Sequence, residues 1–572
     1  MTEVAADDAH GAGSAGDEGG PGEIEAAAGL AVRGASAVPG ATEARRRLIE
    51  AGIPGLLSEK DPTLWGDEAE AEAKIRLGWV DTFRRSRDLL PTLAALREAC
   101  ADLRHVVLAG MGGSSLAPEV IARTLGVELT VLDTTDPHQV RAALADRLDG
   151  TVVVVASKSG STVETDSHRR AYLGAFTAAG LADVGRRFVV VTDPGSPLEA
   201  TGREMGAHVV LADPDVGGRY SALTAFGLVP AALAGVNVAE LLDQAEELAR
   251  SSLSRTDVNP SLALGCALAA AALSGRDKVA VVDDGTGITG LGDWAEQLIA
   301  ESTGKDGAGI LPVVPENPTA PVAAGDDVLI VTAGGSLPPA EVPGGGVRPD
   351  VAVNGPLGAQ FLAWEAATAF AGRLLGINPF DQPNVTESKE NTNRILVAGL
   401  PEEAPRFSDG PVDVHADDTT WAAIGATTLT EVLAGLLRQI GATGYLAVMA
   451  YLDRLGDAAV AEVRPLLARA SGRPVTFGWG PRFLHSTGQY HKGGPPVGVY
   501  LQITGAVVDD LEVPGRPFTF GTLQAAQAAG DRQALVGRGR PLLRLHLTDR
   551  AAGASRLLDA ARQTVRREDR DQ

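Results

Sequence analysis

The stretch TVVVVASKSGSTVET, residues 151–165, contains the pattern from which the fold can be predicted. A run of valines is followed by a short loop of Ser, Gly and Lys and then by the start of a predicted helix. Four more aliphatic runs surround it, at 105–110, 128–133, 186–193 and 207–213. Such runs are typical of strands buried on both faces, as in a parallel sheet covered by helices. Five of them in about 110 residues predict a doubly wound, flavodoxin-like α/β unit.

The rest of the chain continues this alternation of strands and helices. Further strands are predicted at 277–284, 326–333, 444–452, 474–480, 497–504 and 541–547. We therefore expect an α/β protein with two doubly wound lobes, whose parallel sheets are flanked by helices, and a helical N-terminal arm. The expected divisions are a mobile tail at 1–40, the arm with the first lobe at 41–235, a second lobe at 236–420, and a segment at 421–572 that completes the second lobe.

Charge and cysteine content restrict the class of protein. The formal net charge is −23 at pH 7, whereas nucleic-acid binding requires clustered Lys and Arg, so no nucleic-acid partner is expected. An anionic ligand would need a locally positive cleft. The two cysteines, Cys100 and Cys266, lie in apolar helical contexts and predict buried thiols in a reducing compartment. Without a signal-peptide pattern or a long apolar span, we expect a cytoplasmic protein that does not enter a membrane.

Two loops follow predicted strands at the edge where doubly wound sheets bind ligands. The first, GMGGSSLAPEV (110–120), combines glycines with hydroxyl residues. The second, SKSGSTVET (157–165), has five hydroxyl residues and one lysine at the start of a helix. Hydroxyls and backbone N–H groups at a helix N-terminus favour an anion such as phosphate. Neither loop has the Walker A or the dinucleotide pattern, so a phosphate that is not part of a nucleotide is expected.

Three more segments contain candidate catalytic residues. Taken alone, each of these residues could be an ordinary surface residue. Arg219 follows two glycines in GGRYS, and Glu301 lies four residues after Gln297 on one face of the predicted helix 293–303. A carboxylate at such a helix end can act as a base. His485 and His491 lie in FLHSTGQYHKGG. Their spacing fits no zinc pattern, so no metal is expected.

Together these segments resemble the phosphoglucose isomerase family. The motifs are GMGGSSLAP, SKSGSTVET, GGRYS, EQLIAESTGK and NPFDQPNVTESK, and they occur in the family's order. The resemblance covers roughly residues 100–395 and 480–495. It implies an aldose–ketose isomerase that interconverts glucose 6-phosphate and fructose 6-phosphate through a cis-enediol, without a cofactor, as a homodimer.

The resemblance also implies a role for each candidate residue. Glu301 would be the base, Arg219 would stabilise the enediolate, and Lys389 would act where the sugar ring opens. The phosphate would be held by Ser157, Lys158, Ser159 and Thr162. The sugar would be lined by Gly113, Ser114, Ser115, Gln297 and Gln382.

The position of the ring-opening histidine departs from the family. The family has it between the glutamate motif and the DQ motif, but no histidine occurs between Lys305 and Asp381 here. We expect His485 to supply it from the C-terminal part, an order that resembles the isomerase half of transaldolase–isomerase fusions. Two alternatives stay open: an isomerase that also accepts mannose 6-phosphate, and a non-catalytic sugar-phosphate sensor.

Overall fold

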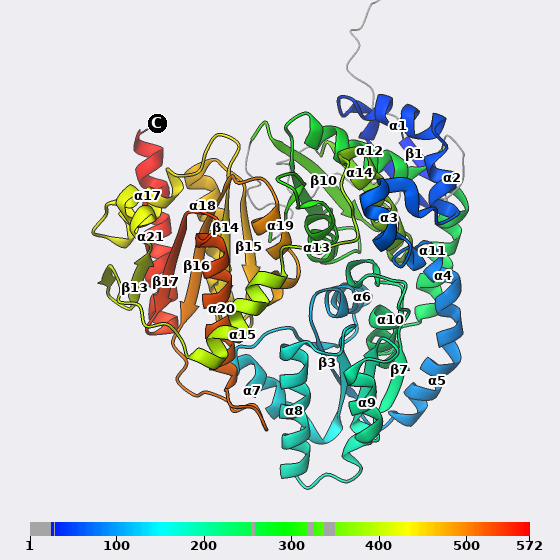
Figure 1. Ribbon diagram of the computed structural model, residues 1–572, viewed down its shortest axis with the longest axis horizontal. Coiled ribbons are helices and arrows are strands. Elements are labelled where there is room, and N and C mark those ends of the chain that lie inside the picture. The colour runs from blue at the N-terminus through cyan, green and yellow to red at the C-terminus, as the bar shows by residue number, and fades with distance from the viewer. Residues whose placement is uncertain (1–23, 28, 253–257, 317–324, 337–348, 572) are drawn as a thin grey trace, which may run out of the picture.

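The computed structural model describes residues 24–27, 29–252, 258–316, 325–336 and 349–571. Three α/β lobes, each with its own sheet, lie around a common centre (Figure 1). The first lobe is at the bottom of the view, the second at the upper right beneath the N-terminal helices, and the third on the left. The α/β class with parallel strands flanked by helices is confirmed.

The first lobe has the five strands that the aliphatic runs predicted. They are β3 (His105–Gly110), β4 (Thr130–Leu132), β5 (Thr151–Ala156), β6 (Phe188–Thr192) and β7 (His208–Leu211), all parallel, in the order β4-β3-β5-β6-β7. This is the flavodoxin-like order. Alternate residues serve opposite faces: Val106 packs with α6 (Leu116–Leu125) and α10 (Ala225–Leu233), and Val107 with α7 (Pro137–Ala145) and α8 (Val163–Ala178).

The second lobe has a sheet with four strands from the middle of the chain and two from its N-terminal region. The order is β1 (Ile24–Ala27), β2 (Leu30–Arg33), β11 (Val351–Asn354), β10 (Val328–Gly334), β8 (Lys278–Asp283) and β9 (Leu311–Val313). Its core helices are α11 (Val238–Ser252), α12 (Pro260–Leu273), α13 (Leu291–Thr303) and α14 (Leu357–Leu375). The helices α1 (Ala41–Glu50), α2 (Ile53–Ser58), α3 (Asp67–Ala73) and α4 (Thr82–Arg85) form the arm, and α5 (Leu90–Ala99) leads to the first sheet.

The N-terminal strands correct part of the expected mobile tail. Residues 1–23 lie outside the described residues, but β1 and β2 form a hairpin whose second strand pairs antiparallel with β11. Leu30 and Val32 are fully buried in the core of the second lobe. Leu30 and Val32 alone, in a Gly- and Ala-rich segment, are too weak a pattern to predict a strand. The segment forms a strand because it pairs with the edge of β11.

The C-terminal region also differs from the expectation that it completes the second lobe. It forms a third sheet of β12 (Phe407–Asp409), β13 (Val412–Ala416), β17 (Leu542–Leu547), β16 (Gly498–Gly505), β14 (Tyr445–Tyr451) and β15 (Val475–Trp479), in that order. Helices α16 (Asp418–Ile424), α17 (Leu429–Leu437), α18 (Val463–Ser471), α20 (Phe520–Val536) and α21 (Arg550–Asp571) belong to it. The N-terminal hairpin already extends one edge of the second sheet, and the aliphatic faces of β14 and β16 pack into a core of their own.

Two connections place the third lobe against the others. Helix α15 (Thr386–Ala398) precedes the third sheet in sequence and packs along α20, as Figure 1 shows. The short helix α19 (Gly488–Gly493) contacts α13 of the second lobe. These two helices carry predicted site residues with them. Lys389 lies on α15, and His485 lies three residues before α19.

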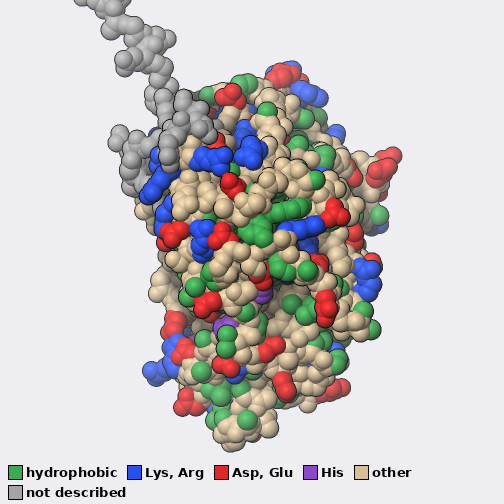
Figure 2. Space-filling view, turned by 90° about the vertical axis from the view of Figure 1, so that its left-hand side faces the viewer, with side chains coloured by type: hydrophobic (Ala, Val, Ile, Leu, Met, Phe, Trp, Pro, Cys, Tyr) green, Lys and Arg blue, Asp and Glu red, His purple; other side chains and the backbone are tan. Residues whose placement is uncertain are grey.

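The surface and the helices give two further observations. Figure 2, seen from the side of the third lobe, shows acidic and basic side chains mixed over this face rather than gathered in a patch of one sign. In the described part of the chain, no single helix is long and apolar enough to cross a membrane. Helices α16 and α17 reach that length and composition only together, and they are bent by 101° at their junction.

Glu365 on α14 provides a test of the core of the second lobe. The side chain is fully buried, and neither carboxyl oxygen has a hydrogen-bond partner within the described residues. Burial raises the pKa of this carboxyl well above its ordinary value. The folded state therefore binds a proton that the unfolded state releases, and the stability of the protein falls as the pH rises from the unfolded pKa towards the raised one.

We predict that Glu365→Met increases the free energy of unfolding by about 1–3 kcal/mol, because a buried unpaired polar group is removed at similar volume. Methionine does not titrate, so the gain should be larger at pH 8 than at pH 5. Urea unfolding of both proteins at the two pH values measures this. A gain that shrinks with rising pH, or a loss at both values, would contradict the prediction.

Candidate functional site

Two glycines after β3 bring segments from all three lobes together. A Cβ atom at Gly113 would lie 1.9 Å from the carbonyl oxygen of Gly218 in the first lobe. A Cβ atom at Gly112, whose φ is +53°, would lie 2.7 Å from Nε2 of Gln297 in the second lobe and 2.9 Å from the carbonyl oxygen of His485 in the third. Any larger residue would push these segments apart, so the glycines allow the predicted site residues to converge.

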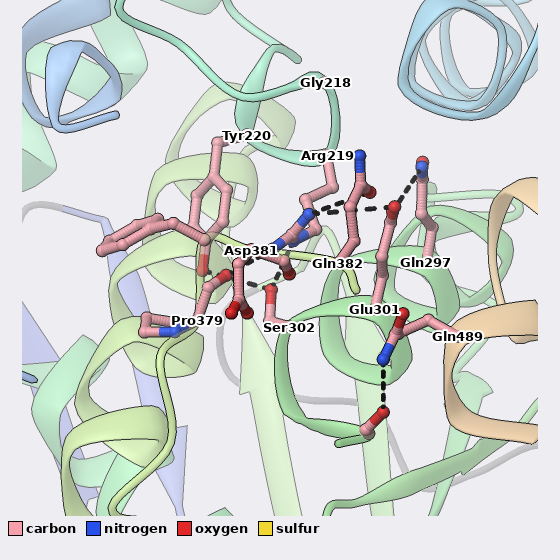
Figure 3. Close-up of polar contacts among 12 residues, drawn as sticks. Gly218, Arg219, Tyr220, Gln297, Glu301, Ser302, Pro379, Asp381, Gln382 and Gln489 are labelled. Atoms are coloured by element: carbon pink, nitrogen blue, oxygen red, sulfur yellow. Dashed lines mark hydrogen bonds and ion pairs between the residues drawn. The ribbon is translucent and has the colours of Figure 1, made fainter. Parts of the chain in front are cut away.

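Glu301 and its neighbours form the first cluster of the site, shown in Figure 3. Glu301 lies on the last turn of α13 and is 7% exposed. Its Oε2 accepts a hydrogen bond of 3.0 Å from Nε2 of Gln297, one turn earlier on the same helix. Its Oε1 lies 3.8 Å from Nη1 of Arg219. The carboxylate is thus held between one amide and one guanidinium.

Arg219 is fixed by the second lobe although it belongs to the first. Its Nε donates to Oγ of Ser302 at 2.8 Å, and its Nη2 donates to the carbonyl oxygens of Pro379 at 2.6 Å and Asp381 at 3.1 Å. Its Nη1 is 3.5 Å from Oε1 of Gln382 and faces Glu301. Four predicted residues, Arg219, Gln297, Glu301 and Gln382, are therefore brought together.

Lys305 holds the loop that presents Gln382. Its Nζ donates to the carbonyl oxygens of Asn378 at 2.6 Å and Asp381 at 2.8 Å, and forms an ion pair of 2.5 Å with the Asp381 carboxylate. Burial, together with the charge of Arg219, lowers the pKa of Lys305 to about 8. The lysine of the ESTGK segment therefore has a role in shaping the loop.

A cavity of about 160 Å³ is lined by four of the nine remaining predicted residues, and it meets the first cluster where Gly112 lies against both Gln297 and His485. Its polar lining comes from the loop before α8, from α15, from the segment before α19 and from α20. It includes Ser159, Ser161, Thr162, Glu164, Ser388, Lys389, His485, Lys492 and Gln527. The fold thus places Lys389 and His485 opposite the hydroxyl loop, although about 96 residues separate them in the sequence.

Ser115, Ser157 and Lys158 of the two loops have internal partners. Ser157 Oγ bonds Thr162 Oγ1 at 2.9 Å, and Lys158 Nζ pairs with Asp193 Oδ2 at 2.6 Å. Ser115 is fully buried, and its Oγ donates to Gly112 O at 3.2 Å. Ser157, Lys158 and Ser115 are not among the residues that line the cavity. In this structure they shape the loops, while Ser159, Ser161 and Thr162 face the open space.

Glu164 is a site residue to which the sequence interpretation gave no role. Its Oε1 lies 3.1 Å from Nε2 of His485 and accepts a 2.7 Å hydrogen bond from Nε2 of Gln527. Burial opposes its ionisation, but the hydrogen bond and charge of His485 and the charge of Lys389 hold the pKa of Glu164 below its ordinary value. Its position within SKSGSTVET, in the first turn of the helix beside the predicted phosphate loop, was the signal that could have identified it.

The segment after His485 is anchored to both neighbouring parts of the site. Gln489 Nε2 donates to the carbonyl oxygen of Gly304, at the end of the Glu301 helix, at 2.9 Å and to Oδ1 of Asn384 at 2.7 Å. His491, by contrast, is packed among tyrosines, and burial lowers its pKa to about 3. Of the two histidines, His485 faces the cavity and His491 belongs to the core.

The described residues contain no group of three or more His, Cys, Asp or Glu side chains arranged to hold a metal ion.

Comparisons with known proteins identify relatives of this chain. The family model described as phosphoglucose isomerase matches residues 93–325. A probable glucose-6-phosphate isomerase of Haloarcula marismortui is 30% identical over 347 residues, which are 52% of this chain and 79% of that protein. A glucose-6-phosphate isomerase of Carboxydothermus hydrogenoformans is 32% identical over 285 residues, and this match spans 46% of the chain and only 60% of that protein.

Two solved structures resemble this chain. A hypothetical protein of Thermus thermophilus superposes with a TM-score of 0.53 and 26% identity, covering 63% of this chain and 98% of that one. A glucose-6-phosphate isomerase of Chlamydia trachomatis gives a TM-score of 0.51 and 21% identity, covering 66% and 91%, and shares the fold. The relative from Haloarcula marismortui, which is 30% identical and matched over 79% of its length, shows together with the family model that the chain belongs to the phosphoglucose isomerase family.

Proposed function

We propose that this protein is a glucose-6-phosphate isomerase, an enzyme that interconverts glucose 6-phosphate and fructose 6-phosphate. The observation that carries the proposal is the position of Glu301 beside Arg219, next to a cavity that contains hydroxyl groups, Lys389 and His485. A base, a fixed cation and an anion-binding loop are the groups that proton transfer in a sugar phosphate requires. The family membership supports the same reaction.

The proton transfer is assigned to Glu301. In the open-chain aldose, the carboxylate removes the proton from C2, and the electron pair forms the C1–C2 double bond of the enediolate while O1 becomes negative. Transfer of the O2 proton to O1 and return of the proton from Glu301 to C1, with formation of the C2=O bond, then give the ketose. Arg219 stabilises the negative charge, and its bonds to Ser302 and Pro379 hold it in place before that charge develops.

The phosphate is assigned to the loop before α8. Ser159, Ser161 and Thr162 face the cavity at the N-terminus of a 16-residue helix, where hydroxyls and backbone N–H groups favour an anion. Lys158 is paired with Asp193, whereas Lys389 lines the cavity and forms no ion pair with any described residue, so Lys389 is the cation assigned to the phosphate. The expected roles of Ser157 and Lys158 are therefore reduced to holding the loop.

Ring opening is assigned to His485. This step needs a proton at the ring oxygen and its removal from the C1 hydroxyl, and imidazole can exchange a proton near neutral pH. Glu164 orients the ring of His485 within the same chain, so the site needs no second subunit to supply this histidine. Assembly as a homodimer stays an expectation from the family, to be measured by light scattering.

The first prediction of this proposal concerns Glu301. Glu301→Gln keeps the shape and the hydrogen bond from Gln297 but cannot accept a proton, so kcat should fall by about 10²–10⁴-fold with little change in KM. Conversion of fructose 6-phosphate to glucose 6-phosphate in a coupled assay measures both constants, and mannose 6-phosphate in the same assay tests the alternative substrate. Glu98→Gln, an exposed helical control, should behave as wild type. If Glu301→Gln keeps more than about a tenth of kcat, Glu301 is not the base.

The second prediction separates ring opening from proton transfer. His485→Ala should slow turnover of the cyclic substrate, whereas exchange of the C1 or C2 proton with solvent in an already open-chain sugar phosphate should stay close to wild type. Isotope exchange followed by NMR distinguishes the two steps. His491→Ala should affect thermal stability rather than either rate, since this ring lies in the core. Equal losses for cyclic and open-chain substrates in His485→Ala would remove the ring-opening role.

A further inference from the structure

The cavity wall contains an ion pair that the mechanism above does not use. Lys492, on α19, lies seven residues after His485, and its Nζ is 2.7 Å from Oδ1 of Asp531 on α20. The same Nζ donates to the carbonyl oxygen of Gly488 at 3.1 Å. The side chains are 1% and 0% exposed. Lys492 nevertheless lines the same cavity as Lys389 and His485.

A pair buried to this degree is weak evidence for a purely structural role. Removing two charges from water is costly, and well-packed apolar residues of similar volume often give an equally stable or more stable protein. One oxygen of Asp531, Oδ2, is buried without a hydrogen-bond partner in the described part of the chain, so the pair is not optimised for stability. Lys492 lines the cavity, which points to a use of this ammonium in the site.

Helix α20 connects this pair with the other groups of the cavity. Gln527 and Asp531 are four residues apart and share one face of the helix. Gln527 donates to Glu164, which orients His485, and Asp531 accepts from Ser388 Oγ at 3.3 Å, next to Lys389. One face of α20 therefore contacts both Glu164, which binds His485, and Ser388, which precedes Lys389.

We propose that Lys492 is a further substrate-binding residue, which donates a hydrogen bond to a sugar oxygen at the ring-opening end, and that Asp531 is its positioning residue. An ammonium has three N–H donors, of which Asp531 and Gly488 take two, so one is left for the cavity. Asp531 neutralises Lys492, which suits a neutral sugar oxygen. The phosphate is better matched by Lys389, which forms no ion pair with any described residue.

This inference rests on the proposed isomerase function, and its test uses an isosteric apolar pair. In Lys492→Met/Asp531→Leu, the melting temperature should stay within a few degrees of wild type, because neither charge is left buried alone. The value of kcat/KM for fructose 6-phosphate should fall about tenfold or more, the loss expected for one substrate hydrogen bond in a dry site. Lys278→Met, which removes another fully buried, ion-paired lysine outside the cavity lining, is the matched control and should keep kcat/KM.

Binding measurements by calorimetry test the same point without turnover. The affinity for glucitol 6-phosphate, an unreactive sugar phosphate, should weaken about tenfold in the double variant, while the affinity for inorganic phosphate should be unchanged. Unchanged affinity for both ligands would overturn the proposal. Equal weakening of both affinities would also overturn it, because it would place the phosphate, and not a sugar oxygen, at Lys492. If the wild-type protein binds glucitol 6-phosphate but does not convert fructose 6-phosphate, the proposed function is wrong. The calorimetric comparison of the two proteins still tests the binding role of Lys492 in that case.

Discussion

The close approach of backbone at Gly112 and Gly113 is the constraint on which the site depends. At these two positions the backbone lies against the carbonyl oxygens of Gly218 and His485 and against the Gln297 side chain, and the glycines place no side chain of their own between them. Because these contacts leave no spare space, a shift of one lobe would displace a catalytic group. Even a small displacement of a catalytic group from its position beside the substrate strongly reduces the rate of the reaction.

Charge is distributed around that point so that an acidic chain can bind an anion. The protein has a net charge of −23, yet Arg219 and Lys389 face the Glu301 cluster and the cavity. Arg219 is held by carbonyl oxygens and a hydroxyl, and among the described residues its one carboxylate partner is Glu301, at 3.8 Å. Lys158, Lys305 and Lys492 are neutralised by aspartates. The site therefore keeps a positive charge where charge develops, while its other cations are neutralised by neighbouring carboxylates.

The sequence was sufficient to predict the first lobe and most of the site. Valine runs specify strands buried on both faces, and the motifs identified Arg219, Gln297, Glu301, Gln382, Lys389 and His485 as residues that would converge. It was not sufficient to assign β14 and β16 to a third sheet, because an aliphatic run indicates a buried strand but not its partners. The hairpin of β1 and β2, the bond between Glu164 and His485, and the pair of Lys492 with Asp531 depend on contacts between distant segments, and local patterns do not contain them.

The central claim is that the Glu301 cluster and the cavity are two halves of one active site. A crystal structure of the protein with an unreactive open-chain sugar phosphate, carrying a planar enediolate mimic at C1 and C2, tests it most directly. We predict the phosphate at Ser159, Ser161 and Thr162, the planar group between Glu301 and Arg219, and His485 within hydrogen-bond distance of an oxygen of the ligand. A ligand that occupies only one of the two halves, or that places its phosphate at Arg219, would contradict the account.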